Sequence, residues 1–418
     1  MMKENKSGGT DGFFPETHEP GIYIHIPFCV RKCIYCDFYS VPGASDRQKA
    51  LYFRALEKEL ELFRKEAEKE DTVRKRGWFA DSLFLGGGTP SAAGADLIVK
   101  LTECVRKSSS GGIGLLSEDS EITMEINPGT VTYGDLLKYR KAGINRLSIG
   151  IQSANEDELR FLGRIHSSGD ALRCISDARR AGFENISVDL IFGFPGNTLA
   201  SWRETLCRIL DVRPSHISVY SLQIEEGTPL YQMFRRDEVE QVTDEENRRM
   251  YHDAVSLLKH SGYEMYEISN ASLPQRACRH NLKYWSMCDY VGFGASAHSY
   301  RNGVRYYNED DISSYIGRMR DACVYERRNE RKNTMEDERG DAIFTCLRRK
   351  EGLNLKWFDS LFFRGEESSF LEKYGKAIRP FLEDGSLILE RGGEGRLRFS
   401  EKGVDLSNYI IGRILSEN

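Results

Sequence analysis

Between residues 21 and 224, six short apolar runs alternate with amphipathic segments, and this alternation constrains the fold more than any other feature. The runs are residues 21–28, 81–88, 121–128, 145–153, 185–195 and 216–224. Apolar residues recur at helical spacing in the segments between them. The runs show little period-two pattern, as expected of strands covered on both faces. The alternation predicts an α/β fold with a parallel sheet and helices outside it.

Polar motifs follow the apolar runs at the point where each run ends. Cys29 follows the first run, and Gly86-Gly87-Gly88-Thr89 ends the second. Glu125 and Gln152 stand at the ends of the third and fourth runs. Barrels of parallel strands carry their active site at the carboxyl ends of the strands. The sequence therefore predicts a partial (β/α)6 barrel of the TIM type over residues 21–225, with a site at this edge.

The composition argues against several classes of protein. The chain has 418 residues and a formal net charge of −5, which gives no reason to expect nucleic acid as a partner. No run approaches the roughly 18 apolar residues of a membrane helix. Residues 1–20 lack the apolar core of a secretion signal, and we interpret them as a mobile leader. Most of the ten cysteines are scattered, as reduced thiols are in the cytoplasm, where we expect the protein to lie.

Two further regions follow the barrel. Residues 226–325 contain an expected helix over 243–263, a strand over 263–269 and an irregular, aromatic and glycine-rich stretch over 270–308. We expect this region to complete the barrel. Residues 326–418 predict helices, two short strands and a closing helix, a small α+β domain like a winged helix. Such domains often bind DNA, but the charges here are mixed, so DNA binding is not expected.

Cys29, Cys33 and Cys36 form a C-x3-C-x2-C pattern on the loop after the first run. Structural zinc takes four protein ligands, and Asp37 is the one acidic residue adjacent to the pattern. A disulfide leaves one thiol over and needs an oxidising compartment. A [4Fe–4S] cluster takes thiolate ligands, and three of them leave the fourth iron open for a substrate or cofactor. The spacing favours a cluster without excluding the alternatives.

Several further motifs accompany the cysteine loop, and together they resemble a known family. They are Tyr23-Ile-His-Ile-Pro-Phe-Cys29, Gly86-Gly-Gly-Thr-Pro-Ser91, Glu125-Ile-Asn-Pro128, Ser148-Ile-Gly-Ile-Gln-Ser153, Leu162-Gly-Arg-Ile-His166, Asp189-Leu-Ile-Phe-Gly-Phe-Pro195, Tyr266-Glu-Ile-Ser-Asn270 and His280-Asn-Leu-Lys-Tyr-Trp285. Most of the chain over residues 21–418 resembles the radical S-adenosylmethionine (SAM) superfamily. Within it, the chain is similar to the oxygen-independent coproporphyrinogen III oxidase-like family, and there to its haem chaperone, or HemW, type.

The resemblance implies that SAM chelates the open iron of a [4Fe–4S] cluster held by Cys29, Cys33 and Cys36. The reduced cluster then splits the sulfonium to give methionine and a 5′-deoxyadenosyl radical. By the same resemblance, the SAM sites are lined by Tyr23, Gly87, Gly88, Thr89, Glu125, Gln152, Arg164 and Asp189. A structural ion pair is the alternative for Arg164, and a helix cap or surface charge for Glu125. Since Asp189 lies inside an apolar run, we expect it to have a partner or a ligand.

His280 lies in an irregular aromatic stretch that suits a flat apolar ligand, and imidazole is a common axial ligand of haem iron. In HemW-type proteins this motif is associated with haem binding, so the resemblance implies that His280 binds haem. The alternative is a barrel-closing motif in which His280 and Asn281 bind backbone groups, and Cys278 is a weaker candidate ligand. The other motif histidines fit a structural role at least as well: His25, His166 and His298.

Phe38 distinguishes two functions. The genuine oxidases of the family carry a further cysteine two residues after the last one of this pattern, where this chain has Phe38. The short leader also lacks the extended N-terminal segment of the oxidases. The resemblance therefore implies a haem chaperone that delivers haem to apoproteins such as respiratory cytochromes and takes electrons for its cluster from a donor. Transient contact with membrane proteins is compatible with this role. Coproporphyrinogen III oxidase activity, or another radical SAM reaction, is the alternative.

Overall fold

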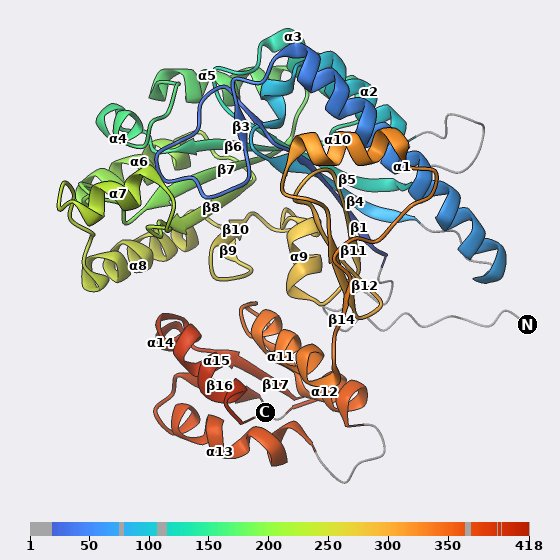
Figure 1. Ribbon diagram of the computed structural model, residues 1–418. Coiled ribbons are helices and arrows are strands. Elements are labelled where there is room, and N and C mark those ends of the chain that lie inside the picture. The colour runs from blue at the N-terminus through green and yellow to red at the C-terminus, as the bar shows by residue number, and fades with distance from the viewer. Residues whose placement is uncertain are drawn as a thin grey trace, which may run out of the picture.

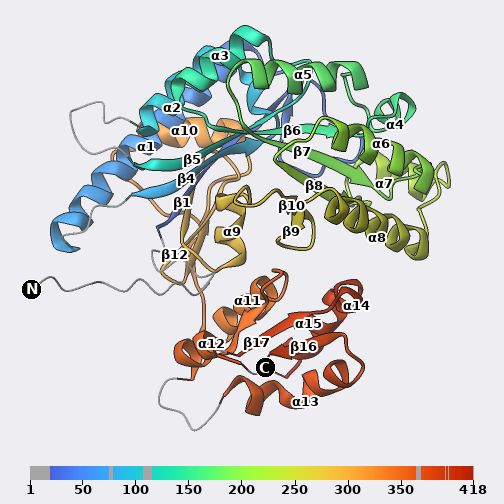
Figure 2. The same cartoon turned by 180° about the vertical axis from the view of Figure 1, so that it is seen from behind.

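The computed structural model describes residues 19–74, 79–106, 115–363, 369–390, 392–393 and 395–417 (Figure 1). The leader expected over residues 1–20 lies almost wholly outside them. One large curved sheet is wrapped by helices, and a smaller unit lies beneath it in Figures 1 and 2. Among the described residues, no helix is both long enough and apolar enough to cross a membrane.

The six predicted strands all exist and lie side by side in chain order. They are β1 (Gly21–Ile26), β4 (Ala80–Gly87), β5 (Leu116–Ile126), β6 (Arg146–Gln152), β7 (Asn185–Phe192) and β8 (His216–Ser221). Each pairs in parallel with the next. Both inward and outward apolar side chains are buried, which explains the missing period-two pattern. The predicted α/β fold is confirmed, and the carboxyl ends of the six strands share one edge.

Helices connect these strands and cover the outside of the sheet (Figure 1). They are α1 (Asp46–Arg74), the short η1 (Pro90–Ala93), α2 (Ala95–Arg106), α3 (Tyr133–Ala142), α4 (Glu156–Phe161), α5 (Ser168–Arg180) and α6 (Leu199–Asp211). Capping boxes fix where several of them begin, as when the Thr132 side chain accepts from the Asp135 amide. Trp202 of α6 packs on Phe192 of β7, with ring centroids 5.2 Å apart. This packing joins the outer layer to the sheet.

The region after β8 adds strands to both edges of the sheet, although the sequence predicts an irregular stretch there. At the β1 edge the added strands are β11 (Tyr290–Phe293), which pairs in parallel with β1, and then the antiparallel β12 (His298–Arg301), β13 (Val304–Tyr307) and β14 (Arg331–Lys332). The helices of this region are α7 (Pro229–Arg235), α8 (Asp244–His260), α9 (Arg279–Trp285) and α10 (Ile312–Asp321). The prediction of irregular structure over residues 270–308 was wrong because β11, β12 and β13 are short and rich in aromatic residues and glycine. β14 lies beyond that stretch, in the predicted C-terminal region.

At the other edge, the single strand predicted over residues 263–269 is also wrong. The segment forms β9 (Glu264–Met265), turns, and returns as β10 (Asn270–Ser272), which pairs antiparallel with both β9 and β8. The Glu267 carboxylate closes the turn by accepting a hydrogen bond from the Ser269 amide at 3.1 Å. A local side-chain bond of this kind competes with a continuous strand.

Residues after Thr334 form a unit with its own apolar core, which includes Phe358, Phe370 and Tyr374. Its helices are α11 (Met335–Cys346), α12 (Leu355–Phe362), α13 (Phe370–Glu383), α14 (Glu401–Asp405) and α15 (Ser407–Leu415). Its sheet has the order β15–β17–β16, with β15 at Leu353–Asn354, β16 at Leu387–Glu390 and β17 at Arg396–Phe399. The predicted helices and hairpin are present, and α12 and β15 were not predicted.

Candidate functional site

The cysteine loop lies at the carboxyl edge of the barrel. It leaves β2 (Phe28–Cys29) and returns through β3 (Val41–Pro42), which pairs in parallel with β2. Cys29 Sγ lies 3.6 Å from Thr89 Oγ1. Arg164 Nη1 donates to Cys33 Sγ at 3.4 Å, and Arg164 Nη2 donates to the Gly150 carbonyl at 2.6 Å. Arg164 therefore contacts the cysteine loop directly, and no ion pair joins it to another residue that the structure describes.

The donor set fits an iron–sulfur cluster in its chemistry. Burial raises the pKa of the Cys29 and Cys36 thiols, and the positive charge of Arg164 acts against this at Cys29. Thiolates bind iron, and a neighbouring guanidinium favours a thiolate. Within the described ranges, no three His, Cys, Asp or Glu side chains are already arranged as a metal site. The cluster is therefore inferred from the loop and its surroundings, and Cys29, Cys33 and Cys36 are the residues that would hold it.

The glycine turn after β4 lies against the start of the cysteine loop. A Cβ on Gly88 would lie 2.8 Å from the Pro27 carbonyl carbon. Gly87 has a φ of 119°, and a Cβ there would lie 2.7 Å from the His25 ring. Gly88 needs to be glycine because backbone atoms leave no room for a side chain, and Gly87 because of its positive φ and the adjacent His25 ring. The Gly87 amide then donates to Glu125 Oε2 at 3.1 Å.

Glu125 is half-buried at the end of β5. Burial raises the pKa of its carboxyl to about 8, the charge of Asp189 adds to this, and the hydrogen bond from Gly87 opposes it. A cationic ligand would stabilise the carboxylate form here. Tyr23 lines the same space from β1, and its hydroxyl lies 3.0 Å from His25 Nδ1. These side chains therefore suit the polar end of a zwitterionic or cationic ligand.

Asp189 has partners, as the sequence predicts. Its carboxylate accepts hydrogen bonds from Ser148 at 2.8 Å and from Ser218 at 2.7 Å. Ser187 reaches the same carboxylate at 3.5 Å and also bonds His216 Nδ1 at 2.7 Å. Burial raises the pKa of Asp189, and the serine hydroxyls act against that rise.

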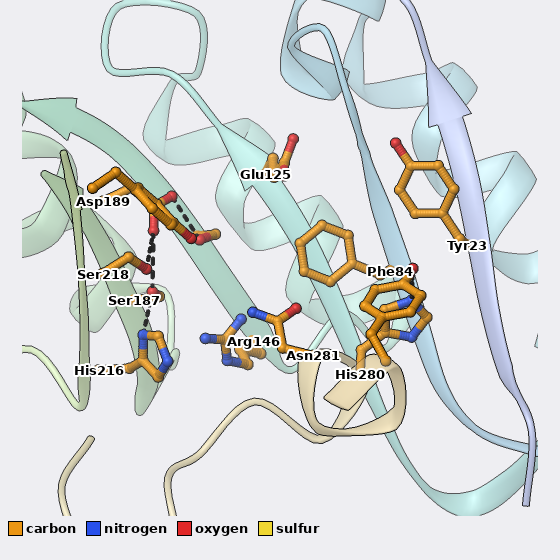
Figure 3. Close-up of a pocket in the computed structure, with 13 residues that line it drawn as sticks. Tyr23, Phe84, Glu125, Arg146, Ser187, Asp189, His216, Ser218, His280 and Asn281 are labelled. Carbon is orange, nitrogen blue, oxygen red and sulfur yellow. Dashed lines mark hydrogen bonds between the residues drawn. The ribbon is translucent and has the colours of Figure 1, made fainter. Parts of the chain in front are cut away.

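Two adjoining cavities lie at the barrel. The inner cavity measures about 220 Å³ and is lined by Tyr23, Phe84, Glu125, Arg146, Ser148, Ser187, Asp189, His216, Ser218, Tyr220, His280, Asn281 and Tyr284 (Figure 3). The outer cavity measures about 360 Å³ and is lined by Tyr23, His25, Phe38, Tyr39, Gly87, Glu125, Tyr284, Tyr290, Ser296 and His298. Tyr23, Glu125 and Tyr284 belong to both, so the cavities share a wall.

The predicted SAM residues fall into groups. Tyr23, Gly87 and Glu125 line the outer cavity, and Asp189 lines the inner one. Thr89 and Arg164 line a separate small hollow with Cys33. Two predicted residues line none of these three spaces: Gly88, which contacts the start of the cysteine loop, and Gln152, which ends β6 with a φ of 72°.

His280 is placed in α9, which lies against the sheet inside the barrel. The ring is 1% exposed. Nδ1 lies 3.0 Å from Ser82 Oγ and Nε2 lies 2.8 Å from Tyr284 Oη. Burial lowers the pKa of His280 to about 3. An axial role in haem binding would cost one of these two hydrogen bonds, so the arrangement favours the barrel-closing alternative. The partners of His280 are side chains, whereas that alternative expected backbone groups. Cys278 is fully buried and faces Glu121, with Sγ 3.5 Å from its carboxylate.

The other motif histidines differ from one another. His25 bonds Tyr23 and the Tyr39 carbonyl, and His166 bonds Asn127 and the Ile151 carbonyl. Burial lowers the pKa of each to about 4, so both rings are neutral at neutral pH, and their hydrogen bonds fit the structural alternative. The exposed ring of His298, by contrast, lines the outer cavity and stacks on Tyr307, with ring centroids 4.9 Å apart.

Arg146, which lines the inner cavity, was not among the predicted site residues. It shares the inward phase of β6 with Ser148, since side chains two apart in a strand point to one face. A charged residue in that phase of an otherwise apolar run was the available signal.

Comparison with known proteins identifies the family. The model of the radical SAM superfamily matches residues 23–209. The chain is 32% identical over 405 residues to the haem chaperone HemW of Bacillus subtilis, covering 94% of this chain and 99% of that protein. It is 30% identical over 396 residues to HemW of Lactococcus lactis, covering 95% and 97%. In fold it matches the coproporphyrinogen III oxidase HemN of Escherichia coli, a radical SAM enzyme, with a TM-score of 0.78 at 20% identity over 96% of this chain and 91% of that one. The chain therefore belongs to the HemW family within the radical SAM superfamily.

Proposed function

We propose that the protein is a haem chaperone that binds a [4Fe–4S] cluster, SAM and haem, and delivers haem to apoproteins such as respiratory cytochromes. Phe38 carries the proposal. Its side chain is 71% exposed at the rim of the outer cavity, where an oxidase would carry a further cysteine. An exposed ring at the mouth of an aromatic cavity suits packing against a flat macrocycle.

Cys29, Cys33 and Cys36 are the proposed cluster ligands, beside the guanidinium of Arg164. The bound cluster would supply the electron that cleaves SAM, so the proposal includes an electron donor as a partner. Thiolates persist in a reducing compartment, and we therefore place the protein in the cytoplasm.

SAM is proposed to lie on the cluster side of the outer cavity, between the Gly87 turn and Glu125. Thr89 lies beside Cys29, and SAM would reach the cluster from this side. The Glu125 carboxyl would take the charged form against the ammonium or sulfonium of SAM, and Tyr23 would supply a hydroxyl contact.

Haem is proposed to cover the mouth of the outer cavity, with His298 as its axial ligand in place of His280. The His298 ring is exposed, and it makes no hydrogen bond to any described residue. An imidazole nitrogen is therefore available to iron. Both ring nitrogens of His280 are already bonded.

The test is a haem titration of the anaerobically reconstituted full-length chain, followed by absorbance. A Soret band that saturates at stoichiometric haem is expected, and its absence would contradict the chaperone proposal. A parallel incubation with coproporphyrinogen III, SAM and a reductant tests the alternative activity. Formation of protoporphyrinogen IX there would replace the chaperone with an oxidase.

A further inference from the structure

Arg146 is a buried cation for which the described residues provide no acceptor. Its side chain is 1% exposed, and Nε is buried without a hydrogen-bond partner. No ion pair or hydrogen bond joins its guanidinium to any other described side chain. Burying an unpaired charge is expensive, so a guanidinium in this position needs an anion or ordered water.

The guanidinium faces the inner cavity. Figure 3 shows it between His216 and Asn281, below the serines that hold Asp189. Burial acts to lower the pKa of Arg146, but the nearby acidic groups, Glu121 among them, outweigh it and raise the pKa, so the charge persists. His216 and His280 both have lowered pKa values because they are buried, so neither adds positive charge.

The acidic groups near this cavity leave room for an anion. The raised pKa of Glu125, about 8, makes it mostly neutral at neutral pH. Asp189 is held by serine hydroxyls. One Glu121 oxygen already accepts hydrogen bonds from the His280 amide at 3.3 Å and from the Cys278 thiol at 3.5 Å. Arg146 therefore remains the charged group whose hydrogen-bonding capacity is unused.

We propose that Arg146 is a carboxylate anchor, and that the inner cavity takes the carboxylate of a ligand. At about 220 Å³ the cavity is smaller than pockets that enclose drug-sized ligands, but a carboxylate arm fits it. The carboxylate has two sources, a propionate arm of a tetrapyrrole in the adjoining outer cavity, or a small free carboxylate anion. The first source rests on the proposed function, and the second does not. Guanidinium binds carboxylate in bidentate fashion, which lysine does not reproduce.

A comparison of haem with haem dimethyl ester tests whether a propionate arm of the tetrapyrrole binds Arg146, because the ester lacks the propionate charges. Each is titrated into the full-length wild type, Arg146→Lys and Arg146→Met, and the Soret absorbance is followed. The wild type is expected to bind haem about tenfold or more tightly than the ester, as a charge-assisted hydrogen-bonded pair requires. Arg146→Met should abolish this preference and Arg146→Lys should retain part of it. The matched control is Arg64→Met, which removes a buried arginine of α1 whose Nη2 bonds the Cys104 carbonyl at 2.7 Å.

Sodium propionate tests the second source without haem. Propionate should raise the thermal unfolding midpoint of the wild type and of Arg64→Met relative to sodium chloride at equal ionic strength, but not that of Arg146→Met. If Arg146→Met does not fold, a crystal structure of the wild type grown in propionate decides. A carboxylate on the guanidinium supports the anchor, and water alone there overturns it.

The outcomes are distinct. An ester preference that depends on Arg146 supports the propionate arm. A propionate effect that depends on Arg146, without an ester preference, supports the free anion. If neither effect depends on Arg146, the anchor is wrong and the residue only balances nearby acids such as Glu121. If no haem binds, the chaperone proposal fails, and the sodium propionate experiment still decides the role of Arg146.

Discussion

The backbone amide of Gly87 donates to the Glu125 carboxylate at 3.1 Å and ties the glycine turn after β4 to the end of β5. Burial and Asp189 nevertheless raise the pKa of Glu125 from 4.5 to about 8. A folded-state pKa above the unfolded value means that the fold favours the protonated acid. The contribution of this group to stability is therefore complete below pH 4.5 and is lost as the pH rises through about 8.

Glu125→Gln should remove this pH dependence. Relative to the variant, the unliganded wild type should lose up to about 3 kcal/mol of unfolding free energy between about pH 5 and pH 8, allowing for the partial exposure of the side chain. Urea unfolding of both proteins at the two pH values measures the difference. A wild-type-minus-variant difference that does not change with pH would contradict the assignment.

SAM binding should release protons because Glu125 must ionise to pair with a cation. Calorimetry near pH 7 in two buffers of different ionisation enthalpy should detect up to about one proton released per SAM in the wild type and none in Glu125→Gln. Glu59→Gln is the matched control, because Glu59 is a buried acid bonded to Tyr315 and Asn308. Proton release that persists in Glu125→Gln would place the titrating group elsewhere.

The barrel was predictable because its strands are covered on both faces and are therefore mostly apolar. Ile22 and Val188 illustrate this, since both are fully buried. Parallel topology then required the motifs at the run ends to meet. The edge strands β11 to β14 were missed because short strands of mixed composition have no periodicity to detect.

The site was predictable only in part, because a sequence does not reveal which nitrogen or oxygen is already engaged. His280 and His298 both stand in aromatic stretches. Ser82 and Tyr284 hydrogen-bond both ring nitrogens of His280, whereas the ring of His298 is exposed. Ser82 lies in a distant strand, so this difference depends on tertiary pairing. Arg146 was missed for a different reason, because its charge inside an otherwise apolar run was a signal that was not used.

Arg164→Met should retain the cluster but lower its reduction potential. The arginine donates to Cys33 Sγ, and loss of a positive charge and a donor to sulfur disfavours the more negative, reduced cluster. Iron content should stay near about four per chain, whereas Cys33→Ser should lose most of it. Arg160→Met, which removes an exposed partner of Asp157 on α4, is the control and should leave the potential unchanged. An unchanged potential in Arg164→Met would exclude the contact with sulfur.

Gly88→Ala should disturb the link between the glycine turn and the cysteine loop. The added Cβ would lie 2.8 Å from the Pro27 carbonyl carbon and 2.9 Å from the Phe28 oxygen, and these are backbone atoms that cannot rotate away. We expect a loss of about 1–3 kcal/mol in urea unfolding, with lower iron content after reconstitution. Gly134→Ala in α3 is the control, since the nearest atom to its Cβ is Thr132 Oγ1 at 3.7 Å. Equal stability of the two variants would show that the turn relaxes freely.

His280→Ala should mainly lose stability, whereas His298→Ala should mainly lose haem ligation. Removing the buried ring of His280 leaves the Ser82 and Tyr284 hydroxyls without their partner and creates a cavity, so unfolding free energy should fall by about 2–5 kcal/mol. Removing the exposed ring of His298 should cost less than about 0.5 kcal/mol. The Soret band of the haem complex should nevertheless weaken and shift in His298→Ala, and persist in whatever fraction of His280→Ala remains folded. The opposite pattern, a normal band in His298→Ala and none in folded His280→Ala, would return the axial role to His280.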